Sequence, residues 1–354
     1  MDYFVTGATG FIGKRLVRKL LKRRGAVVHF LVREASQDKV PELLEYWGAS
    51  RERAVPVVGD LAQPRLGLSA AAARELKGRI DHFFHLAAVY DLKADADSQI
   101  VANIEGTRNA VQLANEIKAG CFQHCSSIAA AGMYEGVFRE DMFDEAENLD
   151  HPYFATKHDS EKIVRKESSI PWRVYRPGLV VGDSQTGEMD KVDGPYYFFP
   201  LLDASSRLPS ALRLLAPRLG DTNLVPVDYV VDAMDALAHE PGLDGRAFHL
   251  VNPEPQPTLD VINVFASLAG GPKLVGAFPR ETLDLPLRLG PVRDKLLPQL
   301  GIPAAALDHA SFTCTFGSRA TRKALAGTGI EVPPLEDYAP VLWRYWKEHM
   351  RDGH

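Results

Sequence analysis

The sequence predicts a doubly wound α/β fold, a parallel sheet with helices on both faces, followed by a smaller C-terminal region. Apolar strand-like runs alternate with helix-like runs through the first half of the chain. A glycine-rich turn lies directly between the first such run and the first helix. Proline becomes frequent and the periodicity is lost after residue 182, which indicates where the regular fold ends.

The composition bounds the class of protein. The 354 residues are enough for two domains, and 45% hydrophobic with 25% charged residues is typical of a globular chain. A net charge of −5 argues against a nucleic-acid partner. The three cysteines form no zinc-like pair, so we expect no metal site. Without a leader or an apolar spanning run, a cytoplasmic location is expected, and peripheral contact with a membrane stays open.

The elements of the first half follow from apolar runs and their breaks. Residues 3–6 form a strand that stops at Gly7, and residues 14–24 place leucines on one helical face before Gly25. Further strands are expected at 26–32, 55–61, 82–86 and 121–126, with a helix over 98–118.

The second half contains fewer regular elements. A strand-to-helix step is expected at 224–238, a strand at 246–252 and a closing helix at 337–349. We therefore expect a nucleotide-binding core of residues 1–182 plus 223–252, and a substrate-binding or lid region of residues 183–222 plus 253–354. The apolar stretch 196–219 fits either a lid over an acyl tail or ordinary core packing.

The glycine-rich turn reads TGATGFIG over residues 6–13. Glycine permits a tight turn there and lets backbone N–H groups at a helix N-terminus approach a pyrophosphate. With a strand before it and a helix after it, the motif predicts a Rossmann-type dinucleotide site. The expected contacts are Gly7, Thr9, Gly10, Phe11, Ile12 and Gly13.

The ends of the second and third strands indicate which dinucleotide binds. Arg33 stands where an acidic residue would bind an unphosphorylated ribose, so a 2′-phosphate and hence NADP(H) is expected. Ser36 and Lys39 add to this pocket, whereas Glu34 would oppose it if it pointed inward. Asp60, followed by Leu61, is expected beside the adenine.

Tyr153 and Lys157 are the candidate acid–base pair. Four residues apart, they share one face of a helix, where the ammonium would lower a tyrosine pKa that is normally near ~10. Tyr153 could then protonate a carbonyl oxygen that Ser127 also binds, while Asn103 fixes a water or braces Lys157. Cys125 is a weaker candidate nucleophile, because no base is identifiable beside it.

Several longer motifs resemble one enzyme superfamily. The glycine turn, HLAAVY at 85–90, HCSSIAA at 124–130, YFATK at 153–157 and YRPGLVVG at 175–182 resemble the extended short-chain dehydrogenases/reductases. LVRE at 31–34, TGEMDKVDGPYYFF at 186–199 and LVPVDYVVDA at 224–233 resemble the N-terminal reductase half of bacterial two-domain fatty acyl-CoA reductases.

The resemblance implies roles for individual positions. Ser127, Tyr153 and Lys157 match the family's catalytic residues, with Lys157 also on the nicotinamide ribose. Ala87 and Ala88 match residues that wall the cofactor. In the family, one segment contacts the carboxamide of the nicotinamide. Its counterparts in this sequence are Pro177, Gly178 and Leu179.

The expected function is NADPH-dependent reduction of a long-chain fatty carbonyl, from acyl-CoA to aldehyde, from aldehyde to alcohol, or both. A second reductase domain, fused or paired, and a homo-oligomer stay open. Another extended carbonyl reductase and a nucleotide-sugar epimerase are the nearest alternatives. Ile128 and Ala129 stand where a dehydratase would carry an Asp-Glu pair. A non-catalytic NADPH-binding protein is the alternative from a different class.

Overall fold

The computed structural model describes residues 1–87, 96–190, 192, 194–254, 256–279, 282 and 314–351. Ala88, one of the expected cofactor contacts, lies outside these residues. The chain divides into two compact units. Unit 1 comprises Met1–Gly178, Tyr229–Leu250 and Phe316–Ile330, and unit 2 comprises Leu179–Asp228, Val251–Thr315 and Glu331–His354.

Unit 1 is built on a seven-stranded sheet of order β12-β7-β5-β4-β1-β2-β3, in which every neighbouring pair is parallel. The order reverses between β1 and β4, which confirms the predicted doubly wound fold. The strands are β1 (Asp2–Thr6), β2 (Val27–Val32), β3 (Ala54–Val58), β4 (Ile80–His85), β5 (Cys121–Cys125), β7 (Trp172–Pro177) and β12 (Arg246–Leu250).

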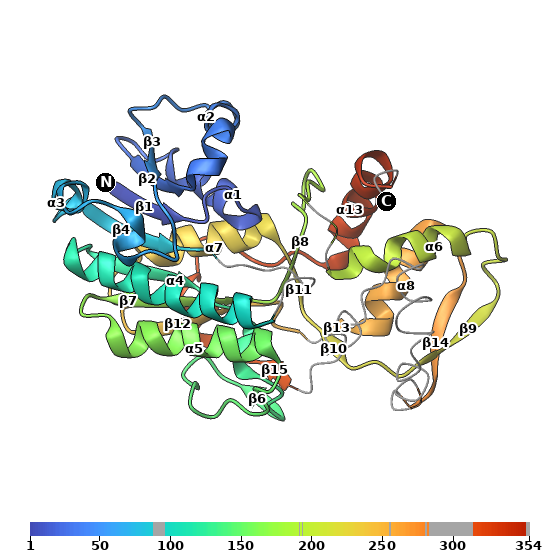
Figure 1. Ribbon diagram of the computed structural model, residues 1–354. Coiled ribbons are helices and arrows are strands. Elements are labelled where there is room, and N and C mark those ends of the chain that lie inside the picture. The colour runs from blue at the N-terminus through green and yellow to red at the C-terminus, as the bar shows by residue number, and fades with distance from the viewer. Residues whose placement is uncertain are drawn as a thin grey trace. The chain divides into compact units, whose positions relative to one another are not determined.

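Helices cover both faces of this sheet (Figure 1). On one face lie α4 (Ala96–Glu116) and α5 (Pro152–Glu167), and on the other lie α1 (Phe11–Leu20) and α7 (Val227–His239). Helix α1 ends at Leu20, earlier than the expected Arg24, because tight Lys22-to-Lys19 and Arg23-to-Leu20 backbone bonds close it as a turn. Shorter elements of the first half are η1 (Glu34–Lys39), α2 (Val40–Trp47), η2 (Pro64–Gly67), α3 (Ala70–Leu76), η3 (Ile128–Ala131) and β6 (Gly136–Phe138).

The core beneath α4 and α5 is aromatic. Phe83 stacks on Phe4 at a ring-centroid distance of 4.7 Å and on Phe122 at 5.4 Å. Each phenylalanine is fully buried, which stabilises the fold by about 2 kcal/mol per side chain. These strand residues alternate with the side chains that face α1 and α7, so the sheet is apolar on both sides.

A buried carboxylate brings a distant segment back to unit 1. The Glu140 oxygens accept from the backbone N–H groups of Ala320, Thr321 and His249 and from the Thr321 hydroxyl, at 2.5–3.1 Å. The segment carries α12 (Arg319–Ala324) directly after β15 (Cys314–Phe316). Residues 316–330 therefore belong to unit 1, although most of the chain around them belongs to unit 2.

Unit 2 is small and mixed. Phe199 lies at the centre of its aromatic core, with ring-centroid distances of 4.6 Å to Phe265, 5.1 Å to Trp343 and 5.5 Å to Trp346. Strands pair as β8 (Leu179–Val181) with β11 (Leu224–Pro226), β9 (Arg213–Pro217) with β14 (Lys273–Phe278), and β10 (Asp221–Thr222) with β13 (Gln256–Pro257). The helices are η4 (Gly194–Phe198), α6 (Phe199–Ser205), α8 (Thr258–Ala269) and α13 (Leu335–His349).

Helices in the described part of the chain are all too short or too polar to cross a membrane.

Candidate active site

The candidate site lies at the C-terminal edge of the unit 1 sheet, where parallel strands present their final residues. Thr6 ends β1, His85 ends β4 and Cys125 ends β5. Thr6 and His85 are register partners at the point where the strand order reverses. In open α/β sheets this crevice is where ligands bind.

The turn after β1 requires glycine at two positions. Gly7 has φ = +74°, and a Cβ there would lie 2.6 Å from the Ala87 backbone nitrogen. A Cβ on Gly13 would lie 2.0 Å from the Gly7 carbonyl oxygen. The turn is therefore closed tightly against Ala87, the described member of the expected cofactor wall.

The N-terminus of α1 is suited to an anion. Gly10 caps the helix without a side-chain hydrogen bond, and the first turn contains no acidic residue. Thr9 and Gly10 are exposed, while Phe11 and Ile12 are half-buried. Backbone N–H groups at such an end have no partner within the helix, so these residues fit the pyrophosphate of a dinucleotide.

The ends of β2 and β3 carry the side chains expected near the rest of the cofactor. Arg33 is exposed and precedes η1, and the Ser36 N–H donates to the Arg33 carbonyl at 2.8 Å, so the two residues lie one turn apart. Asp60 accepts from the Ala62 N–H at 2.9 Å, which makes its carboxylate a turn cap as well as a candidate ligand. The Leu61 carbonyl accepts from Asn109 of α4.

Ser127 follows β5 and caps η3. Its hydroxyl accepts from the Ala129 N–H at 3.2 Å, and its carbonyl accepts from the Ala130 N–H at 3.1 Å. The backbone of Gly132, at φ = +64°, then turns beside Glu147, where Met133 N–H bonds the Glu147 carbonyl. These bonds hold the segment that carries Ser127 in one conformation.

Helix α5 carries Tyr153 and Lys157 in its first turns. His151 caps the helix, its ring nitrogen accepting from the Tyr153 N–H at 3.2 Å. The Lys157 ammonium lies 5.9 Å from the centre of the Tyr153 ring. The next residue, His158, donates from Nδ1 to the Ala130 carbonyl of η3 at 3.1 Å. This bond ties the Ser127 turn to the helix of Tyr153 and Lys157, so the structure brings the elements of all three residues together.

A hydrogen-bond chain joins the glycine turn to α4. The Thr107 hydroxyl donates to the Asn103 carbonyl at 2.7 Å and therefore accepts from Nε2–H of His85 at 3.1 Å. His85 Nδ1 must then accept from the Thr6 hydroxyl at 2.8 Å, and Thr6 in turn accepts from the Ala87 N–H at 3.4 Å. Every proton in the chain is assigned, and His85 is fixed as one neutral tautomer.

The series of hydrogen bonds ends at the Asn103 carbonyl, which accepts from Thr107. The same carbonyl also accepts from the Ser160 hydroxyl of α5 at 3.5 Å. Sequence reasoning assigned neither His85 nor Thr107 to the site. His85 opens the HLAAVY motif and Thr107 follows Asn103 by one helical turn, and those two positions were the available signals.

The histidines beneath the site are held neutral. Burial lowers the pKa of His85 well below its usual value, and His124 and Lys157 lower it further. His124 stacks on His85 at 5.7 Å, and burial, with Lys157, lowers its pKa to about 3. Burial also raises the pKa of Cys125, although Lys157 opposes this, so Cys125 is held as a thiol rather than a nucleophilic thiolate.

The remaining expected contacts lie where the sequence passes from unit 1 into unit 2. Pro177 ends β7 and Gly178 donates to the Leu250 carbonyl, both within unit 1. Leu179 begins β8 in unit 2, where its N–H donates to the Asn223 carbonyl at 2.7 Å.

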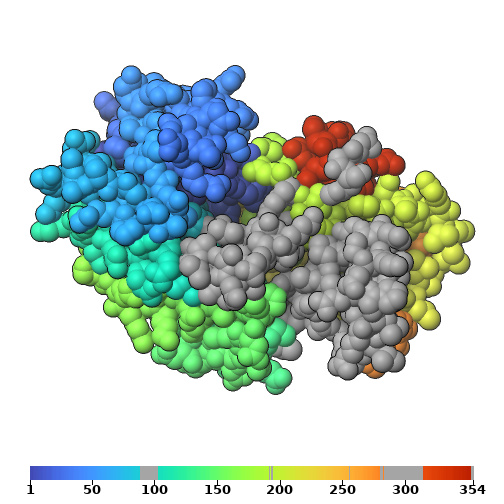
Figure 2. Space-filling model, in the orientation of Figure 1, coloured from blue at the N-terminus to red at the C-terminus, as the bar shows by residue number. Residues whose placement is uncertain are grey.

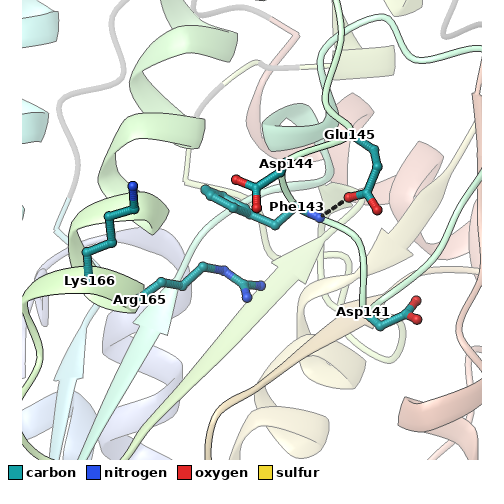
Figure 3. A pocket seen from close by; sticks show the side chains of 6 residues that line it. All are labelled: Asp141, Phe143, Asp144, Glu145, Arg165 and Lys166. Atoms are coloured by element: carbon teal, nitrogen blue, oxygen red, sulfur yellow. Dashed lines mark hydrogen bonds between the residues drawn. The ribbon is translucent and has the colours of Figure 1, made fainter.

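A separate surface cavity of about 290 Å³ lies at the other end of α5 (Figure 3). Arg165 extends across it toward the Phe143 ring, 4.6 Å from the ring centre, and Phe143 N–H bonds the Glu145 carboxylate. The cavity lies two helical turns from Lys157, roughly 12 Å along the axis. It is therefore separate from the candidate site.

Curated proteins similar to this chain include reductases and peptide synthetases. It is 32% identical over 264 residues to a linear gramicidin synthase of Brevibacillus parabrevis, a match that covers 70% of this chain and 5% of that protein. It is 28% identical over 278 residues to aldehyde reductase lnbA of Aspergillus flavus, a match that covers 73% of this chain and 27% of that protein. It is 27% identical over 223 residues to the putative fatty acyl-CoA reductase CG8303 of Drosophila melanogaster, a match that covers 51% of this chain and 41% of that protein. The chain thus spans less than half the length of each of these relatives.

A solved structure matches along almost the whole chain. The terminal R domain from the myxalamid PKS-NRPS biosynthetic pathway superposes with a TM-score of 0.80 at 26% identity, covering 99% of this chain and 91% of that domain. Fold and matches together define an extended short-chain dehydrogenase/reductase. The chain belongs to the male sterility protein family of NAD-binding domains, whose model matches residues 5–234.

Proposed function

We propose that the chain is an NADPH-dependent reductase of long-chain acyl thioesters and of the aldehydes they yield. The observation that supports this best is the His158–Ala130 bond, which fixes the Ser127 turn against the helix of Tyr153 and Lys157. This bond supports a site in which the Ser127 hydroxyl, the Tyr153 phenol and the Lys157 ammonium act together beside the glycine turn. That set suits proton delivery to a carbonyl oxygen beside a hydride donor.

A nicotinamide cofactor bound at the glycine turn would supply the hydride that reduces the carbonyl carbon. For an aldehyde, Tyr153 donates its proton to the oxygen as the C–O double bond is reduced, and Ser127 holds that oxygen. For a thioester, Tyr153 and Ser127 stabilise the oxyanion, the C–S bond then breaks, and the thiolate leaves as the aldehyde forms. Lys157, one helical turn after Tyr153, would bind the nicotinamide ribose. Each carbonyl reduced consumes one NADPH and one proton.

Arg33 and Ser36 support the choice of NADPH over NADH. Both follow β2, where a carboxylate would otherwise bind the ribose hydroxyls, and a guanidinium forms charge-assisted hydrogen bonds to a 2′-phosphate. The proposed adenine contact is Asp60.

A carrier-bound thioester is the second candidate substrate. It is favoured by the similarity to the linear gramicidin synthase and to the terminal R domain of the myxalamid pathway. The fatty substrate is supported by the sequence motifs and by the similarity to the putative fatty acyl-CoA reductase. Both substrates require the same chemistry at the carbonyl.

The test follows NADPH oxidation with three substrates in parallel: a long-chain fatty aldehyde, the matching acyl-CoA and the same acyl group on a phosphopantetheine carrier. We expect turnover of the aldehyde and at least one thioester. Tyr153→Phe should lower kcat by about 100-fold or more with NADPH binding retained, since only the proton donor is lost. Arg33→Ser should weaken NADPH binding but leave NADH use unchanged.

The outcomes separate the alternatives. Turnover of the carrier thioester alone would replace the acyl-CoA by a carrier substrate, and turnover of the aldehyde alone would restrict the enzyme to the second step. An absence of turnover with all three, while NADPH still binds, would reject this function and favour another carbonyl substrate.

A further inference from the structure

Exposed leucines gather on one part of unit 2. Leu215 of β9 is 71% exposed, and Leu201, Leu208, Leu212, Leu268 and Val275 are each exposed by more than a third. Single exposed leucines are ordinary, but a contiguous group of them marks an interaction surface. Figure 2 shows the yellow-green segment that joins α6 to β9 at the molecular surface.

Backbone geometry joins Leu215 and Val275 to each other and to the segment that carries Leu208 and Leu212. Leu215 is the register partner of Val275, and Arg213 is the partner of Lys273, so all four side chains project from the exposed face of the β9–β14 ribbon. Residues 206–212 precede that ribbon and are exposed throughout. A Cβ on Gly271 would lie 2.4 Å from the Ser205 hydroxyl, so the start of this segment lies against the loop before β14. We call residues 206–215 with Lys273–Val275 the leucine tip.

The turn at the leucine tip is internally bonded. Leu208 N–H donates to the Ser205 carbonyl at 2.9 Å, and Leu212 N–H donates to the Pro209 carbonyl at 3.0 Å. The Arg213 guanidinium donates to the Leu212 carbonyl at 3.1 Å. The leucines are therefore presented by a closed turn and not by an extended loop.

The leucine tip is also purely cationic. Its charged residues are Arg207, Arg213 and Lys273, with no Asp or Glu, in a chain whose net charge is −5. In the described structure none of these three cations has a carboxylate within ion-pair distance. The neighbouring Asp203 already pairs with Lys347 and Arg351, at 3.7 and 3.0 Å. The cations are available to a partner.

We propose that the leucine tip docks on an anionic lipid surface, with its leucines among the acyl chains and its cations at the phosphate level. Leucines beside unpaired arginines and lysines, without acids, are the pattern of interfacial membrane contacts. The proposal concerns binding alone and does not rest on the catalytic function proposed above.

A lipid surface fits better than a protein partner. The aromatic anchors that dominate the affinity of protein interfaces are absent from residues 204–220, although arginines are present there. A second copy of the chain would bring cations against cations, because a two-fold contact pairs identical surfaces. Lipid headgroups supply the negative charge, and the acyl region accepts leucines in any orientation.

The test is co-sedimentation with vesicles of phosphatidylcholine containing phosphatidylglycerol, at low and at physiological salt. We expect binding that requires the anionic lipid and weakens with salt. The variant R207Q/R213Q/K273Q should lower the partition coefficient by about 100-fold, at roughly fivefold per charge. The variant L208S/L212S/L215S should lower it by at least about tenfold.

Matched controls come from unit 1. K22Q/R24Q/R51Q removes three exposed cations and V137S removes an exposed apolar side chain, and both should bind vesicles as the parent chain does. The proposal is overturned if the parent chain ignores anionic vesicles, or if the unit 1 charge variant loses binding instead. It is also overturned if sedimentation shows that the leucine variants act by abolishing self-association.

Discussion

At the residue scale, one imidazole tautomer links the glycine turn to helix α4. His85 is the central member of the chain from Ala87 to Asn103, and each neighbour can donate or accept in one direction only. Because His85 is buried and neutral, it cannot relieve a lost partner by protonation. Loss of a hydrogen bond at one end of this series should therefore weaken the bonds at the other end.

Thr107→Val tests this dependence. The substitution keeps the shape of the side chain but leaves the buried His85 Nε2–H without an acceptor, which should cost about 1–3 kcal/mol in the free energy of unfolding by urea. NADPH should bind several-fold more weakly, because the His85 ring that accepts from Thr6 is no longer held by a second hydrogen bond. Thr107→Ser retains the hydroxyl and should behave almost as the parent does. Equal effects of valine and serine would show that the hydrogen-bond chain does not matter.

The candidate site residues that the sequence predicts are those whose chemistry follows from local spacing. Tyr153 and Lys157 are four apart, and Gly7, Gly10 and Gly13 follow one strand directly. His85 and Thr107 contact each other across 22 residues, and His158 reaches Ala130 across 28. Such contacts depend on how β4, α4 and α5 pack against one another. No local sequence pattern predicts that packing.

At the element scale, the β1–α1 unit is determined by how closely its backbone packs. Gly13 lies against the Gly7 carbonyl so closely that any side chain must displace backbone atoms. The strand–glycine–helix pattern predicts this unit because the steric demand acts within eight residues. The end of α1 was less predictable: the basic run 22–24 continues the helical composition, but the backbone closes at Leu20.

Gly13→Ala should therefore be severe. With Cβ 2.0 Å from the Gly7 oxygen, α1 must shift, and we expect NADPH affinity to fall by more than about tenfold, with a stability loss of at least about 2 kcal/mol. Gly25→Ala is the matched control, since Gly25 has φ = +70° and open space around it. It should cost only about 1 kcal/mol in stability and leave NADPH binding intact. Cofactor titration and thermal unfolding distinguish the two, and equal cofactor affinity in both variants would contradict the steric argument.

At the scale of the whole molecule, unit 1 is completed by contacts that span most of the sequence. Glu140 binds the backbone of Ala320 and Thr321, about 180 positions later, and His249 Nδ1 donates to the Gly317 carbonyl at 2.7 Å. Alternating strands and helices predict the parallel sheet, but nothing in residues 316–330 indicates a return to it. The division of function between the two units stays a prediction.

Buried ionisable groups make this architecture sensitive to acid. Burial and neighbouring cations lower the pKa of His124 and His249 to about 3, and burial beside His239 lowers that of His82 to about 4. Arg176 donates to His249 Nε2 at 3.1 Å, so protonation there would face a guanidinium. Burial alone would raise the pKa of Glu161, but Arg176 and Arg165 lower it to about 2.

These shifts predict where stability is lost. A histidine whose pKa falls on folding binds its proton more tightly in the unfolded chain, so its contribution is complete above pH ~6.5 and lost as the pH falls toward ~3. In that window each histidine should lower the free energy of unfolding by about 1.4 kcal/mol for each pH unit of acidification. Glu161 adds a loss only below its unfolded value near pH ~4.5. We therefore expect the free energy of unfolding to decline from pH 6.5 downward, before any carboxylate titrates.

His124→Phe isolates one of these groups. The ring is 3% exposed, stacks on His85, and has no hydrogen-bond partner among the described residues, so phenylalanine can replace it without stranding a polar neighbour. Urea unfolding at pH 7.5 and at pH 5 gives the fall in the free energy of unfolding between the two. That fall should be about 2 kcal/mol smaller in the variant than in the parent. His349→Gln, at an exposed position of α13, should leave the pH dependence unchanged. If the parent and His124→Phe decline in parallel between pH 6.5 and 5, then His124 is protonated in the folded chain, and its neutral stack on His85 is wrong.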